Sequence, residues 1–254
     1  MNYITSFDGL FWLLLTLTAL IFLQRILHRE IQAFFLVLTR RPAATQVIFA
    51  LIFFPGVLLH ELSHFLSAKL LGVRTGRFSI FPQPLPNGRL RLGYVETDSG
   101  GAVRDALIGA APLVTGCLFV AWAAISRLGM LPLWDFLRSG NWAIFWMGMQ
   151  VVLGVPDFWL WFYLIFVVSS TMMPSASDRG AWLPVGLFAG GLVIVVILAG
   201  AGPWMLEHLT PGFNSFLRAL ALIFGLSAVL HALLILPFLL LHRLLARLTG
   251  VDVK

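Results

Sequence analysis

Long, almost unbroken apolar segments follow one another along the chain, with short polar connections between them. A helix that crosses the hydrocarbon core of a bilayer needs about 20 predominantly apolar residues. Pro156-Asp157 interrupts one of the segments, so residues 141–155 are either re-entrant or part of a span, and residues 158–173 can span alone. The pattern predicts six membrane-spanning helices, at residues 9–27, 43–71, 103–125, 141–173, 182–201 and 213–241.

These runs are continuously apolar and do not alternate between apolar and polar residues, which excludes a transmembrane β-barrel. The composition agrees, because 59% hydrophobic and 11% charged residues leave too little polar surface for a soluble domain. The first apolar run lacks a basic leader and carries Asp8, so it is expected to be a retained helix rather than a signal peptide. We therefore predict an all-α membrane protein with one domain over residues 1–254.

The largest polar insertion, residues 73–104, separates the second and third predicted spans. Residues 77–81 and 89–95 flank a proline-rich turn that ends in Asn87-Gly88, a dipeptide suited to tight reversal. Leu90, Leu92 and Tyr94 alternate with polar or small residues, as in a strand with one apolar face. The insertion is predicted to form a short amphipathic β-hairpin at the membrane surface.

Charge distribution predicts the orientation of the chain. Six alternating crossings place the hairpin, residues 174–180 and the C-terminal tail on one side, with a small excess of Lys and Arg. The positive-inside rule makes that side cytoplasmic, in a multi-pass protein of the cytoplasmic membrane. The net charge of +6 is explained by arginines that flank the spans, so no nucleic-acid partner is expected. The single cysteine, Cys117, excludes an intrachain disulfide and a thiolate metal cluster.

The second apolar run contains the sequence His60-Glu61-Leu62-Ser63-His64. Residues four apart on a helix lie on nearly the same face, so the imidazoles of His60 and His64 can bind one metal ion. Glu61 lies about 100° round the axis from His60, near the metal but free to accept a proton from water. Burying three ionisable groups among apolar residues is costly unless they have a ligand. Imidazole nitrogens suit zinc, so the motif predicts a zinc-dependent hydrolase with Glu61 as general base.

The position of the motif predicts how deep the metal lies. Lys69, the first charge beyond it, is about 12 Å from Glu61 along the helix axis, so the metal is expected under one membrane surface, the cytoplasmic one. Pro55-Gly56, about one turn upstream, either opens the helix locally or is a tolerated pair without effect. The small residues Gly109 and Gly116 predict that the third span approaches the motif helix closely.

A catalytic zinc ion usually has three protein ligands, so a third is needed. Asp178 fits best, because six alternating crossings return the end of the fourth span to the side of His60 and His64. His231 lies deep in the last span, where a hydrogen-bonded core histidine is favoured over a ligand. The acidic and histidine residues that could be the third ligand are Asp105, Asp157, Asp178, Glu207, His208 and His231.

Two segments make the chain resemble the site-2 protease family of intramembrane zinc metalloproteases. One is the His60 to His64 motif, and the other is Thr171-Met172-Met173-Pro174-Ser175-Ala176-Ser177-Asp178. The resemblance implies that His60, His64 and Asp178 bind one Zn²⁺ and that Glu61 is the base. Family members typically have asparagine where this chain has Thr171 and an aspartate-glycine pair where it has Asp178-Arg179. The likeness covers roughly residues 43–182, without the PDZ or nucleotide-sensing domains of some relatives.

The resemblance implies hydrolysis of a peptide bond in or near a transmembrane segment of a membrane protein or peptide. A helical substrate must partly unwind first, and the edge of the hairpin then either pairs with it or serves only as a connection or lipid anchor. Two other functions are open: a metal transporter or sensor, which would need further ligands on other spans, and an inactive scaffold of the same fold. The sequence carries no signal of the substrate, the regulator or the oligomeric state.

Overall fold

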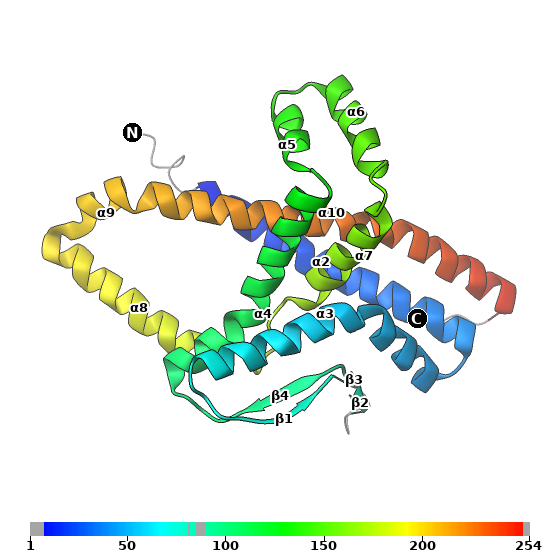
Figure 1. The fold of residues 1–254 in the computed structure, drawn as a ribbon, viewed down its shortest axis with the longest axis horizontal. Helices are drawn as coiled ribbons and strands as arrows, with labels where there is room; N and C mark the ends of the chain where they lie inside the picture. Colours follow the sequence, from blue (N-terminus) through cyan, green and yellow to red (C-terminus); the bar gives the residue numbers. More distant parts are fainter. Residues whose placement is uncertain (1–7, 81, 85–89, 251–254) are drawn as a thin grey trace.

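The computed structural model describes residues 8–80, 82–84 and 90–250, and within them the protein is a helical membrane protein (Figure 1). Five helices are long and apolar enough to cross a membrane, and a bent helix pair brings the number to six. The predicted fold class is therefore confirmed. The long helices are α2 (Asp8–Thr39), α3 (Pro42–Leu70), α4 (Ala102–Trp122, continued by the π-helical turn Ala123–Arg127), α8 with α9 (Trp182–His208) and α10 (Thr210–Thr249).

Two helices extend well beyond the apolar runs that predicted them. α2 continues from the expected end at residue 27 to Thr39, and α10 continues from residue 241 to Thr249. The expected boundaries were wrong because the charged residues beyond them either have hydrogen-bond partners or extend their side chains away from the helix bundle. Glu30 is buried and accepts hydrogen bonds from Arg29 and His242, while the Arg29 side chain remains 74% exposed.

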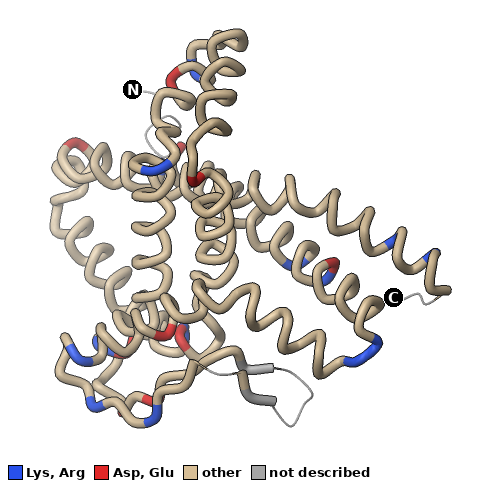
Figure 2. The backbone as a smooth tube through the Cα atoms, turned by 45° about the vertical axis from the view of Figure 1, so that its right-hand side comes forward, with Lys and Arg blue, Asp and Glu red and all other residues tan. Residues whose placement is uncertain are grey.

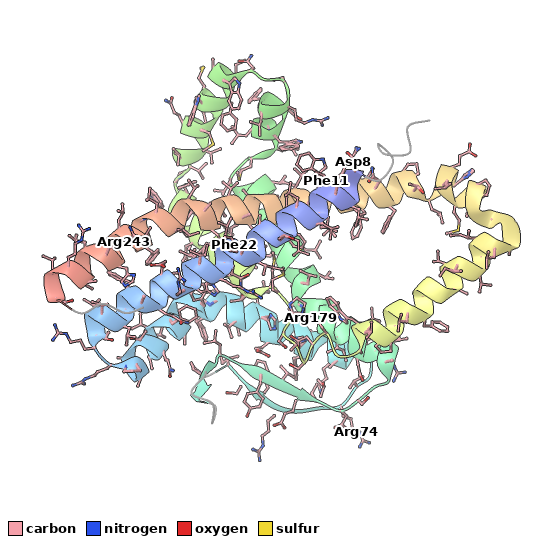
Figure 3. All side chains as sticks on the ribbon, turned by 180° about the vertical axis from the view of Figure 1, so that it is seen from behind. Asp8, Phe11, Phe22, Arg74, Arg179 and Arg243 are labelled. Carbon is pink, nitrogen blue, oxygen red and sulfur yellow. The ribbon has the colours of Figure 1, made fainter. Side chains whose placement is uncertain are left out.

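α2 and α10 lie side by side and run in the same direction. Near their N-termini the Arg218 guanidinium lies 2.6 Å from Asp8 Oδ1, and further along, His242 Nδ1 lies 3.0 Å from Glu30 Oε2. Figure 3 shows Asp8 at the end of α2 that lies beside α10. Six alternating crossings would instead make the first and last spans antiparallel. The structure therefore does not support six alternating crossings, which placed the C-terminal tail on the same side as the hairpin. That the hairpin side is cytoplasmic stays a prediction.

Helices α3 and α7 (Phe158–Thr171) run parallel, and α7 ends beside His60 of α3. The Tyr163 hydroxyl donates a hydrogen bond of 2.7 Å to the carbonyl of Ile52, and eight residues further on each helix His60 contacts the carbonyl of Thr171. The start of α4 packs against the end of α3, where His64 contacts the carbonyl of Ile108. The end of α7 and the first turns of α4 therefore meet α3 at His60 and His64.

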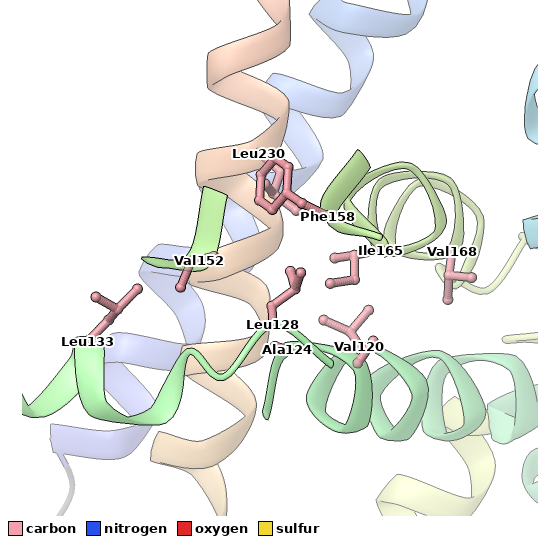
Figure 4. Close-up of a cluster of buried hydrophobic side chains, with 10 residues drawn as sticks. Val120, Ala124, Leu128, Leu133, Val152, Phe158, Ile165, Val168 and Leu230 are labelled. Atoms are coloured by element: carbon pink, nitrogen blue, oxygen red, sulfur yellow. The ribbon is translucent and has the colours of Figure 1, made fainter. Parts of the chain in front are cut away.

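The predicted fourth span is two helices. α6 (Trp142–Leu153) and α7 are separated by residues 154–157 and bent by 96°, and α5 (Leu131–Arg138), which the apolar pattern did not predict, packs against α6. A buried apolar cluster joins this part to the long helices (Figure 4): Val120, Ala123, Ala124, Leu128, Leu133, Val152, Phe158, Ile165, Val168 and Leu230. α7 is therefore fixed against α4 and α10, whereas α5 and α6 project from the body (Figure 1).

α8 (Trp182–Val196) lies away from the other helices, and none of its residues is buried (Figure 1). A π-helical turn, Ile197–Ala201, leads into α9 (Gly202–His208) through Gly200, whose φ of 92° requires glycine. Trp182 ties the start of α8 to α4, because its indole N–H donates to the carbonyl of Ala106. In a bilayer the apolar surface of α8 is suited to contact with lipid.

The predicted β-hairpin between α3 and α4 is present. β1 (Thr75–Ser79) pairs antiparallel with β4 (Tyr94–Thr97), and β2 (Gln83–Pro84) pairs antiparallel with β3 (Leu90–Arg91). The first limb begins two residues before the expected 77–81, and the second is divided at Leu92-Gly93, which belongs to neither strand. Phe81, Arg89 and the turn predicted at Asn87-Gly88 lie outside the described residues.

Charged residues gather around the hairpin and at helix ends, while the long helices are free of charge over most of their length (Figure 2). Large apolar side chains point outward instead, such as Phe11 and Phe22 of α2, which are 61% and 63% exposed (Figure 3). An exterior of apolar side chains is typical of a protein surrounded by lipid.

Candidate metal centre

Three side chains predicted as metal ligands converge where α3, α4 and the segment after α7 meet. His60 Nε2 and His64 Nε2 are 3.3 Å apart. Asp178 Oδ2 lies 3.8 Å from His60 Nε2, and Asp178 Oδ1 lies 3.5 Å from His64 Nε2. Among the described residues, this is the group of three His, Cys, Asp or Glu side chains close enough to hold one ion.

Backbone carbonyls fix the tautomer of both imidazoles. His60 Nδ1 lies 2.7 Å from the carbonyl oxygen of Thr171, and His64 Nδ1 lies 2.8 Å from that of Ile108. A carbonyl oxygen can only accept a hydrogen bond, so each Nδ1 carries the proton and each neutral ring presents a lone pair at Nε2. Orientation of a ligating histidine by a hydrogen bond at its other nitrogen is the usual arrangement at metal sites.

The donor set fits a divalent metal ion. Two Nε2 lone pairs and a carboxylate point at one another, an arrangement of acceptors that a cation stabilises. Tetrahedral zinc with nitrogen ligands at about 2.0–2.1 Å holds them about 3.3 Å apart, and His60 Nε2 and His64 Nε2 are separated by 3.3 Å. Two nitrogens and one oxygen are also a ligand set of catalytic zinc sites, which leave a fourth position for water.

Asp178 is held in place by its own segment and by α4. The backbone N–H of Ser175 donates to Asp178 Oδ2 at 2.7 Å. The carbonyl of Asp178 packs directly on Gly109 of α4, where a Cβ atom would collide with it. The backbone of α4 therefore positions the candidate third ligand.

The small residues of α4 thus have a different neighbour from the one expected. Gly109 contacts the backbone of Asp178, and Gly116 lies against the side chain of Met172, so their close approach is to the segment after α7. The glycine of the motif helix α3 that makes such a close contact is Gly56, which packs on Val167 and Thr171 of α7. α3 remains one continuous helix through Pro55.

The other residues considered as third ligands are placed elsewhere. Asp105 accepts hydrogen bonds from Gly100 N and Ser99 Oγ at the start of α4. Asp157 is at the opposite end of α7 from the site, and Glu207 and His208 are on exposed α9. His231 is fully buried, with its ring nitrogens 2.8 Å from Ser170 Oγ and 2.7 Å from the Ser227 carbonyl. It is a hydrogen-bonded core histidine.

Glu61 is buried on the same turn of α3 as His60, and the hairpin covers it. Gly93 lies so close that a Cβ there would be 2.8 Å from Glu61 Cγ and 3.1 Å from Glu61 Oε1. Glu61 and His60 form one end of a cavity of about 260 Å³ between α2, α3, the hairpin and the end of α7. The candidate base therefore faces a space that the hairpin helps to close.

His28 of α2 is a residue of the site that the sequence analysis did not single out. Its ring borders the cavity and packs edge-on against Phe49 and Phe53, and its Nε2 is buried without a hydrogen-bond partner among the described residues. An ionisable side chain within an apolar run was the available signal. The predicted end of the first span at residue 27 concealed that signal.

Comparison with known proteins adds no relative. No protein-family model, curated protein or solved structure matches the chain.

Proposed function

We propose that this protein is an intramembrane zinc metalloendopeptidase of the site-2 protease kind, which hydrolyses a peptide bond in or near a transmembrane segment. The observation that carries the proposal is the convergence of His60, His64 and Asp178 beside Glu61 in an apolar helical protein. The third ligand comes from a segment more than 100 residues away in the chain, so the helix motif alone does not produce the cluster.

When bound there, zinc would supply Lewis acidity and lower the pKa of a bound water to about 7. The carboxylate of Glu61 takes the proton of the attacking water and later delivers it to the leaving nitrogen. Thr171 and Ile108 hold the two imidazoles through their carbonyls, so that both Nε2 atoms face Asp178. Burial of Glu61 and cover by the hairpin restrict water to what the cavity admits.

The resemblance to site-2 proteases remains part of the proposal, and its departures from the family pattern have local explanations. Thr171 replaces the family's asparagine, and its hydroxyl donates to the carbonyl of Val167, so its backbone carbonyl is the group that contacts His60. Arg179 replaces glycine after Asp178, and its Nε donates to the Ser175 carbonyl within the same turn. Neither change prevents Asp178 from reaching the histidines.

A metal transporter or sensor is the rival from another class. It needs a series of ligands along the spans, whereas the described part of the chain has one such cluster. His231, the deepest alternative ligand, already contacts Ser170 and Ser227. An inactive scaffold would not need Glu61 beside the ligands. The arrangement therefore favours an enzyme with a membrane protein or peptide as substrate. Its place in the cytoplasmic membrane, with the site nearer the cytoplasmic side, stays a prediction from the sequence.

The test is Glu61→Gln in purified protein reconstituted into liposomes with a single-span reporter protein. Glutamine keeps the size of the side chain but cannot accept the proton, so we expect cleavage to fall by about 10²- to 10⁴-fold. Zinc content and thermal stability, measured on the same samples, should equal those of wild type. Cleavage by the Glu61→Gln protein at the wild-type rate would refute the assigned base.

A further inference from the structure

The cavity beside Glu61 follows one face of α3 away from the metal ligands. Val57 and Phe53 lie one and two turns before Glu61 on that face, and Leu92 of the hairpin forms part of the wall. Ser170 and Thr171 line it at the end of α7. Its walls are thus mainly apolar, and the polar side chains among them are the candidate base, the candidate ligand His60, Ser170, Thr171 and His28 of α2.

The size of the cavity limits what can occupy it. At about 260 Å³, it is below the range of about 300–1,000 Å³ that is typical of sites for whole small molecules. A single large side chain on an unwound segment fits both the volume and the apolar walls.

We infer that this cavity is the specificity subsite of the enzyme and that it takes one large apolar side chain of the substrate, next to the cleaved bond. The inference rests on the proposed peptidase function and adds the substrate class: an unwound segment with a leucine-sized or aromatic residue beside the cut. Adjacency to Glu61 and His60 sets the position of that residue, because the cavity opens beside the groups that act on the bond.

Leu92 is the residue best suited to test the subsite. It is half-buried and lies outside the membrane helices, between β3 and β4, so its replacement leaves the contacts between α2, α3 and α7 in place. Phe78 of β1 is a matched control on the same hairpin, because it is 41% exposed and is not part of the cavity wall. Cys117, the native thiol, is buried and does not compete in disulfide cross-linking.

The binding experiment uses Leu92→Cys in the Glu61→Gln background and a single-span reporter with Gly-Pro in its apolar segment and one cysteine moved along it. Mass spectrometry of the products from wild-type enzyme defines the cleaved bond. We expect cross-links from Leu92→Cys at one or two reporter positions beside that bond, and fewer from Phe78→Cys. Equal cross-linking along the whole reporter, or equal cross-linking by the Phe78→Cys control, would overturn the subsite.

The activity experiment varies the reporter residue beside the cleaved bond. With wild-type enzyme we expect kcat/KM for Leu or Phe to exceed that for Asp by about 10- to 100-fold. Leu92→Trp fills part of the cavity and should shift the preference from Phe toward Ala, whereas Phe78→Trp should not. Cleavage that depends on Glu61 but is equal for all side chains refutes the subsite alone, whereas cleavage that is independent of Glu61 refutes the peptidase itself.

Discussion

Two glycines bring backbone into direct contact with the residues of the site. Gly93 lies against Glu61, and an added Cβ would stand 2.8 Å from its Cγ, below normal contact distance. We predict that Gly93→Ala displaces the Glu61 carboxylate and lowers cleavage at least 10-fold, while zinc content is unchanged. Cleavage assays and metal analysis of the same preparation measure both.

Gly76→Ala is the control for that change, since it lies on the same hairpin and its added methyl meets the side chain of Glu96 and no residue of the site. It should cleave like wild type. If the Gly93→Ala protein also cleaves at the wild-type rate, the hairpin does not contact the base as described.

Gly109 has the corresponding role for Asp178, the proposed third ligand. The carbonyl of Asp178 occupies the space that a Cβ at residue 109 would need, so Gly109→Ala must move the Asp178 segment away from α4. Because second-layer changes typically cost about 10- to 100-fold in metal affinity, we predict weaker zinc binding of that order. Competition with a chelator of known affinity measures it.

Gly186→Ala on α8, where a Cβ has no neighbour within 4 Å, is the matched control and should bind zinc like wild type. Unchanged affinity in Gly109→Ala would mean that α4 does not position Asp178.

At the scale of elements, the pairing of α2 with α10 includes a buried hydrogen bond between Glu30 and His242. Glu30 is 4% exposed and contacts His242 at 3.0 Å. His242→Ala leaves the carboxylate with Arg29 alone, so we predict a loss of about 3 kcal/mol in the free energy of unfolding. Arg218→Ala removes the exposed contact with Asp8 at the other end of the same helices and should change stability little.

The two variants are compared by unfolding in mixed micelles that contain an increasing fraction of denaturing detergent. Equal loss in the two variants would show that burial of the Glu30–His242 pair does not stabilise the helix pair.

The apolar pattern predicted each long helix, because a run of about 20 apolar residues has few alternatives to a helix. It could not predict how far α2 and α10 continue, since the Glu30–His242 contact joins residues 212 positions apart. The motif from His60 to His64 was predictable because helix geometry alone puts both imidazoles on one face. Asp178 needed the family resemblance and the crossing order.

His28 and Gly93 were not predicted as parts of the site, because they reach it only through the packing of α2 and the hairpin on α3. The parallel course of α2 and α10 was also missed, since counting of apolar runs assumes strict alternation. Contacts between residues far apart in the sequence cannot be predicted from the periodicity of apolar residues.

For the whole molecule, we propose that one zinc ion is bound by side chains from two segments far apart in the sequence. These are two imidazoles of α3 and a carboxylate after α7. Removal of either kind of ligand should release the ion, because the remaining donors are too few for a stable tetrahedral site. The most direct measurement is metal analysis by mass spectrometry of purified, folded wild type, His64→Ala and Asp178→Ala. We predict about one zinc per chain in wild type and a large loss in both variants, whereas equal zinc in all three proteins would contradict the account.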